Sequence, residues 1–130
     1  MIETLPRWAK VSLALMAVGL IALALVAMLD DDLGGAEPAR WWVAPGASLG
    51  PTSREMPIVV DEVACASGRS AEGRIVVEVV YGSDAIDIAV GVRPLGGDQE
   101  CPSNPDTPFT VELSEPLGDR TITGERPNLP

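Results

Sequence analysis

The segment GRIVVEVVYGSDAIDIAVGVRP, which runs from Gly73 to Pro94, decides the fold. Two apolar runs flank Gly82-Ser83, and a glycine at the first central position is typical of a two-residue type II′ turn. Pairing outward from this turn brings three apolar pairs onto one face, namely Val79 with Ile86, Val77 with Ile88 and Ile75 with Val90. The turn and the alternation together predict an antiparallel hairpin.

The other face of this predicted hairpin places Glu78 opposite Asp87. Like charges in a cross-strand pair repel each other, so we expect this face to be wet. Outside the hairpin, candidate strands lie in PIVVDEVA from Pro57, FTVELSE from Phe109 and DRTIT from Asp119. Residues 57–124 are therefore predicted to form a small all-β, sandwich-like domain of about four or five antiparallel strands, followed by a flexible tail at 125–130.

The two cysteines of the chain lie on either side of the hairpin. Cys65 precedes its open end and Cys101 follows it, and the predicted register sets Gly73 beside Val92, so both flanks leave the hairpin at the same end. We predict a Cys65–Cys101 disulfide that stabilises this small domain by about 4 kcal/mol. A reactive thiol is disfavoured because the residues around Cys101 are acidic and oppose thiolate formation.

An apolar block precedes this domain. Residues 11–29, VSLALMAVGLIALALVAML, carry no charge and are long enough to cross a hydrocarbon core of about 30 Å. Arg7 and Lys10 precede the block and Asp30 follows it, which predicts a cytoplasmic N-terminus at 1–10 and an outward C-terminal part in a bacterial cell membrane. A signal peptide cleaved after Ala24 is the alternative, but the length of the block favours a retained, single-pass signal-anchor.

Residues 30–56 are rich in glycine, proline and alanine and show no clear period, so they are interpreted as a linker. This linker contains Trp41 and Trp42, whose large apolar surface is atypical of a solvated linker. Two interpretations stay open for them. They pack on the β-domain as a short strand, or they contact a partner or the outer membrane interface, where tryptophan is favoured.

The composition excludes several kinds of chemistry. The chain has no histidine, which removes the usual general base of serine and cysteine hydrolases and the commonest zinc ligand. Two carboxylate pairs, Asp84 with Asp87 and Asp61 with Glu62, are interpreted as solvated strand residues. The net charge of −10 would repel nucleic acid. We therefore predict no catalytic residue, no cofactor and no nucleic-acid partner.

A cation site is the remaining alternative for the acidic residues. Asp98, Glu100 and Asp106 lie in one loop and are candidates to hold a calcium ion, although their spacing does not match an EF-hand. The leading interpretation is simpler, because acidic loop residues keep an exported domain soluble. No metal site is therefore predicted.

The segments CASGRSAEGRI and CPSNPDTPFTVELSEPLGDRTITG resemble a group of small exported or membrane-anchored proteins of high-GC Gram-positive bacteria. The likeness covers roughly Pro57 to Gly124. It implies an exported location and this domain extent, and it transfers no functional residue.

These features lead to two functional hypotheses. The first is a non-catalytic, membrane-anchored extracytoplasmic module that contacts another component of the cell envelope, a protein or the cell wall. The second is an extracytoplasmic binding domain for a small ligand or a cation such as calcium.

Overall fold

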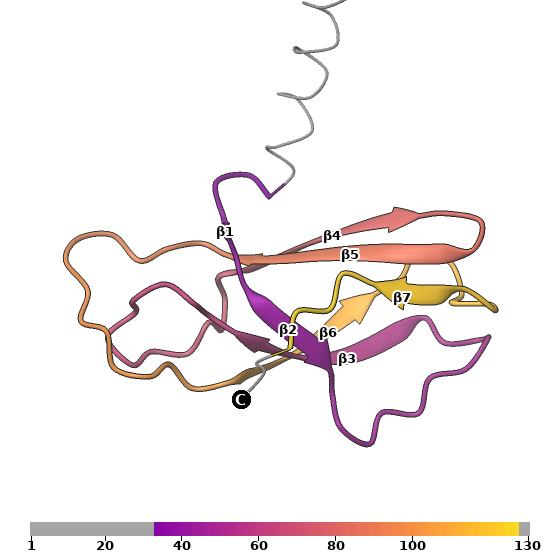
Figure 1. Ribbon diagram of the computed structural model, residues 1–130, viewed down its shortest axis with the longest axis horizontal. Coiled ribbons are helices and arrows are strands. Elements are labelled where there is room, and N and C mark those ends of the chain that lie inside the picture. Colours follow the sequence, from indigo (N-terminus) through magenta and orange to yellow (C-terminus); the bar gives the residue numbers. More distant parts are fainter. Residues whose placement is uncertain (1–32, 128–130) are drawn as a thin grey trace, which may run out of the picture. The chain divides into compact units, whose positions relative to one another are not determined.

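The computed structural model describes residues 33–127, which form seven strands in two sheets (Figure 1). The strands are β1 (Glu37–Pro38), β2 (Arg40–Val43), β3 (Glu55–Asp61), β4 (Ile75–Tyr81), β5 (Ala85–Val92), β6 (Thr107–Glu112) and β7 (Thr121–Thr123). One sheet has the order β1-β5-β4, with β7 also paired to β5, and the other has the order β2-β3-β6. The predicted small all-β domain is thus confirmed, with more strands than expected and one parallel pair, β5 with β7.

The predicted hairpin forms, but its register differs by two residues from the prediction. Val79 pairs with Ile88 instead of Ile86, because Gly82 belongs to the ladder and donates its N–H to the Ala85 carbonyl at 2.8 Å. The turn therefore lies at Ser83-Asp84, and the type II′ prediction is wrong, since Gly82 does not have the positive φ that this turn needs.

The physical reason for the shift lies in the pairs that it creates. A shift of two residues keeps every side chain on its predicted face, because the side-chain period of a strand is two. It adds Tyr81–Ile86 as a fourth apolar pair, and Glu78 now faces Ala89 instead of Asp87. The observed register therefore removes the like-charge pair that the predicted register contained.

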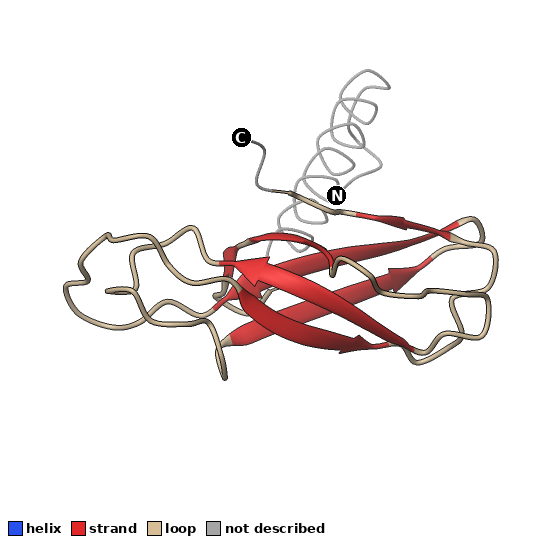
Figure 2. Cartoon of the chain, turned by 90° about the horizontal axis from the view of Figure 1, so that it is seen from below, coloured by secondary structure: helices blue, strands red, loops and turns tan. Residues whose placement is uncertain are grey.

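The core lies between the two sheets, which Figures 1 and 2 show as two layers. Alternate residues of β5 and β3 point inward, so that the burial of each strand follows the period of two. The largest fully buried side chains are Trp41, Met56, Ile58, Ile86, Ile88 and Val60. Long loops extend beyond the strands at one end of the domain.

The predicted linker over 30–56 is wrong for much of its length. Residues 37–43 contribute β1 and β2, β3 already begins at Glu55, and the compact β-unit starts at Leu33. These residues form strands because they pair with edges of other strands. β1 pairs with Val92 and Gly91 along the edge of β5 that faces away from β4, and this edge would otherwise be exposed there. Sequence composition suggested a linker because these strands are short and their partners lie far along the chain.

Pro57 lies in β3, the central strand of its sheet, where proline is normally avoided. It is tolerated because β2 ends at Val43, which pairs with Ile58. The missing N–H of Pro57 therefore falls just beyond the paired part of β2, and the Pro57 carbonyl still accepts a hydrogen bond from Ala44 N–H at 2.9 Å.

The C-terminal segment is held more firmly than a flexible tail. Arg126 and Trp41 exchange two backbone hydrogen bonds of 2.9 Å, and Glu125 accepts one from Val43 N–H at 2.8 Å. Gly124 precedes them with a φ of +97°, and a Cβ atom there would lie 2.2 Å from the Ile88 carbonyl oxygen. Only glycine fits this close approach, so the predicted tail at 125–130 is wrong for its first two residues.

The predicted cytoplasmic segment and membrane-spanning block, residues 1–29, lie outside the described residues. Within residues 33–127, no helix is long and apolar enough to cross a membrane.

Candidate functional site

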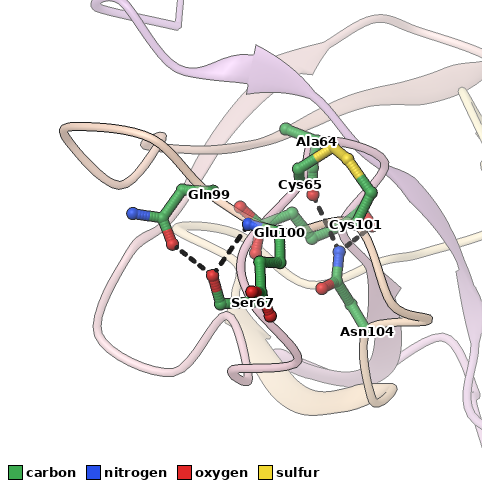
Figure 3. The surroundings of a disulfide bond; sticks show 8 residues. Ala64, Cys65, Ser67, Gln99, Glu100, Cys101 and Asn104 are labelled. Atoms are coloured by element: carbon green, nitrogen blue, oxygen red, sulfur yellow. Dashed lines mark hydrogen bonds between the residues drawn. A yellow bond between two sulfur atoms is a disulfide. The ribbon is translucent and has the colours of Figure 1, made fainter.

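The disulfide predicted from the sequence is present (Figure 3). Cys65 and Cys101 are bonded, with their Cα atoms 4.5 Å apart. Arg93 N–H donates to the Arg74 carbonyl at 2.9 Å, so the hairpin ends at this pair and not at Gly73 and Val92. The two flanking loops still leave the same end, which is why the bridge forms despite the shifted register.

Hydrogen bonds reinforce the bridge on both sides. Ser67 N–H donates to the Glu100 carbonyl at 2.9 Å, and Glu100 N–H donates to Ser67 Oγ at 3.0 Å. Asn104 Nδ2 donates to the carbonyls of Glu62 and Ala64, at 2.9 and 2.8 Å (Figure 3). The bridge therefore has the surroundings of a structural staple.

Asp61 and Glu62 are buried, so their interpretation as solvated strand residues is wrong. Each has an arginine partner: Asp61 Oδ2 lies 2.6 Å from Arg40 Nη2, across the β2–β3 pair. Glu62 accepts two hydrogen bonds from Arg74, at 2.6 and 2.7 Å. A bidentate pair of this kind satisfies both carboxylate oxygens, which allows the charge to be buried.

Arg74 links three segments of the loop end. Besides Glu62, it donates to the Ser70 carbonyl at 3.0 Å and to the Arg93 carbonyl at 2.8 Å. The hydrogen bonds to Glu62 raise the pKa of Arg74, so the guanidinium stays charged in any ordinary buffer. The Glu62–Arg74 pair is thus a structural connection between β3 and the hairpin.

The other acidic candidates are all exposed. They are Asp84, Asp87, Asp98, Glu100 and Asp106. Asp87 Oδ1 accepts a hydrogen bond from Thr123 Oγ1 at 2.8 Å, which joins β5 to β7. In the part of the chain that the structure describes, no three histidine, cysteine, aspartate or glutamate side chains gather to hold a metal ion.

The two tryptophans have different environments. Trp41 is 1% exposed and belongs to the core, so it is unavailable as a partner or membrane contact. Trp42 is half-buried beside it in β2 and pairs with Val59. The first of the two interpretations, a short strand packed on the domain, is therefore confirmed for Trp41, whereas a partner or membrane contact of Trp42 stays a prediction.

A different region forms an open hollow, which we call the β4–β6 groove. It has a volume of about 440 Å³ and is lined by Val77, Val79, Phe109, Thr110, Val111 and Glu112. Its four apolar side chains come from the inward faces of two strands in different sheets. Val77, Val79 and Phe109 are only half-buried, although their cross-strand partners, Val90 and Ile88 on β5 and Ile58 on β3, are almost fully buried. The sandwich is thus open along this side.

Both strands that border the groove have a free edge. Within residues 33–127, β4 pairs only with β5 and β6 pairs only with β3. The bond from Arg93 to Arg74 and the bond from Gly82 to Ala85 show that even-numbered β4 residues bond to β5. By the alternation of antiparallel ladders, Val77 and Val79 direct their N–H and C=O groups to the free edge.

The same reasoning applies to β6. Leu113 N–H donates to the Arg54 carbonyl at 2.7 Å, so odd-numbered residues of β6 bond to β3. Thr110 and Glu112 therefore direct their backbone groups to the free edge. Pro108 faces the same way and has no N–H to donate.

Hydrogen bonds fix both ends of the groove. Tyr81 Oη accepts a hydrogen bond from Ser114 N–H at 2.8 Å, and Arg120 lies over the Tyr81 ring, 5.6 Å from its centroid. At the other end, the buried Thr107 Oγ1 accepts from Ala71 N–H at 2.9 Å. These contacts connect the β4 and β6 segments of the chain at each end of the groove.

Sequence reasoning missed this groove. The predicted hairpin gave the inward face of β4, and FTVELSE was predicted as a strand, but neither prediction shows which edges stay unpaired. Pro108 was a usable signal, because proline within a strand marks an edge.

The chain matches no protein-family model, no curated protein and no solved structure. The resemblance of Pro57–Gly124 to small exported proteins therefore stays a prediction.

Proposed function

We propose that this protein is a non-catalytic, membrane-anchored module whose β-domain lies outside the cytoplasm and contacts another protein of the cell envelope. The observation that carries the proposal is the β4–β6 groove. Its half-exposed valine and phenylalanine side chains lie on a chain with a net charge of −10. Apolar surface exposed within a polar rim is typical of a protein-interaction site.

The bonding of the cysteines and of the buried carboxylates supports a non-catalytic role. Both cysteines are bonded to each other, and Asp61 and Glu62 are held by arginines. A general acid or base needs access to a substrate proton, and a nucleophilic cysteine needs a free thiolate. These four side chains therefore serve the fold.

The disulfide supports the proposed compartment. Structural disulfides form and persist outside the reducing cytoplasm. A location of residues 33–130 on the outer side of the membrane agrees with the positive charges that precede residues 11–29.

Photo-crosslinking in the cells that make this protein tests the proposal. A photoreactive amino acid is placed in turn at Val63, Val79 and Val80, because these side chains are exposed or half-exposed on different surfaces. We expect an envelope protein to be captured from at least one position, and its capture to be lost when Cys65 is replaced by serine and the domain is destabilised. Capture of no protein from any position would contradict the proposal.

The calcium-binding alternative stays a prediction, and the exposed positions of Asp98, Glu100 and Asp106 offer no observation in its favour. A rise in melting temperature of the full chain at millimolar calcium, absent with magnesium, would favour it.

A further inference from the structure

We propose that the β4–β6 groove receives an extended segment of the partner protein, which adds as a strand to the free edge of β4. The segment carries apolar side chains at alternate positions, which enter the groove, and lysine or arginine between them, which meet the glutamates at its rim. This inference rests on the proposed function and specifies the site and chemistry of the contact.

Among the strand edges formed by residues 33–127, the free edge of β4 is the least protected. The strands at the opposite edge of its sheet, β1 and β7, have two and three residues, and β2 is bridged to Arg126. Short edges and covered edges are the usual means of avoiding unwanted pairing. β4 instead presents seven residues, IVVEVVY, with neither proline nor lysine. It therefore offers a continuous template for another strand.

The choice of β4 over β6 follows from the backbone donors. Val77 and Val79 direct both an N–H and a C=O outward, whereas Pro108 interrupts the donors of β6. A strand paired with β4 would turn alternate side chains toward Phe109 and Val111 on the facing sheet. Main-chain bonds then supply affinity, and the apolar groove supplies specificity.

The charge of the rim selects the partner. Glu112 lines the groove and Glu55 is its cross-strand partner, while Glu78 lies on the outer face of β4, where the outward side chains of an added strand would stand beside it. None of these three carboxylates takes part in an ion pair within residues 33–127, and Arg54, which precedes Glu55 in the sequence, donates to the Ser114 carbonyl. A basic segment complements this rim.

A second copy of this chain is a poorer occupant. It would bring another net charge of −10 to the contact. Two β4 strands centred on each other would also place Glu78 opposite Glu78, which is unfavourable in a cross-strand pair. The partner therefore has a different sequence, and self-association is an outcome that the test can detect.

The test uses the full chain in detergent micelles and a synthetic peptide, Lys-Val-Thr-Val-Lys-Val-Thr, with a control in which glutamate replaces both lysines. Backbone amide shifts locate the peptide, and fluorescence anisotropy measures its Kd. We expect shifts at Val77, Val79 and Thr110, and a Kd for the basic peptide about tenfold or more below that of the control. Shifts elsewhere, or equal affinities, would overturn the proposal.

Two variants test the edge and the charge separately. Val77→Pro removes an outward N–H while leaving the β4–β5 ladder donors in place. It should weaken binding of the basic peptide about tenfold or more. Val80→Thr is its matched control, because Val80 is exposed on the other face of β4. Tryptophan emission checks folding, because the buried Trp41 should emit at shorter wavelength in the folded domain. Should Val77→Pro fail this check, Glu112→Lys provides the second variant, with preference expected to turn toward the acidic peptide. Unchanged preference would overturn the proposal.

The remaining outcomes separate this inference from the proposed function. A photoreactive residue at Val79 that crosslinks to a second copy, or to residues 1–32 of its own chain, overturns the strand-addition proposal. Capture of an envelope partner from Val63 or Val80 but not from Val79 also overturns it, and leaves the proposed function standing. Capture from no position overturns both.

Discussion

The loop end of the domain, around the Cys65–Cys101 bridge, and the β4–β6 groove differ in the side chains that they bury. At the loop end, Asp61 and Glu62 are buried with their arginine partners beside a disulfide. In the groove, Val77, Val79 and Phe109 are half-exposed, although apolar side chains on the inner face of a sandwich are normally buried. One region buries charge and the other exposes apolar groups, and both depart from the usual distribution.

The difference indicates where stability and interaction are located. A buried ion pair is strongly destabilising when one partner is lost, so the loop end is sensitive to single substitutions. A half-exposed valine contributes less to folding than a buried one, because less of its surface leaves water. The groove is therefore free to be specialised for a partner.

The disulfide is expected to give the largest effect. Replacing Cys65 or Cys101 by serine should lower the free energy of unfolding by about 4 kcal/mol, because the bridge closes a loop with a sequence separation of 36. The double replacement should cost about as much as either single one, since each removes the same bond. Denaturant unfolding of the full chain in detergent, followed by tryptophan emission, measures the loss. Additive losses would show that the cysteines stabilise the domain separately.

Breaking the buried pair is the next largest perturbation. Glu62→Ala leaves the Arg74 guanidinium without its bidentate partner and should cost about 3 kcal/mol. Glu115→Ala is the matched control, because Glu115 also pairs with an arginine, Arg120, but is half exposed; it should cost less than about 1 kcal/mol. The same unfolding experiment compares them. Equal losses would show that burial of Glu62 does not strengthen its contribution.

The cross-strand pair Val77–Val90 compares the groove with the core directly. Both valines lie on the inner face of the β4–β5 hairpin, but Val90 is 3% exposed and Val77 is half-buried. Val90→Ala should cost about 2 kcal/mol and Val77→Ala about 1 kcal/mol. Thermal and denaturant unfolding measure both. A loss at Val77 as large as that at Val90 would mean that the groove is closed in solution.

The smallest effect on the free energy of unfolding is expected at the rim of the groove, where a substitution should raise this free energy instead of lowering it. Glu112 and Glu55 face each other across β3 and β6, which is an unfavourable like-charge pair. Glu112→Lys should raise the free energy of unfolding by about 0.5 kcal/mol, with less effect in high salt. The basic peptide should bind this variant more weakly. A gain in stability together with unchanged peptide binding would separate the rim charge from recognition.

Much of the fold followed from local sequence patterns. The alternation in residues 73–94 determined the inward face of the hairpin, and this face survived the two-residue register shift because the side-chain period of a strand is two. The position of the cysteines on either side of the hairpin determined their pairing. Both features depend on residues close in sequence or on a single hairpin, so a local pattern was enough.

The candidate site could not be predicted in the same way, because it is defined by contacts between distant segments. The burial of Glu62 requires Arg74, and the burial of Trp41 requires both β3 and the segment at Arg126. The chain by itself determined an all-β domain, its disulfide and the inward side chains of its main strands. Only the tertiary structure decided which strand edges are covered and which stay open, since an edge is free or paired according to what the whole chain brings beside it.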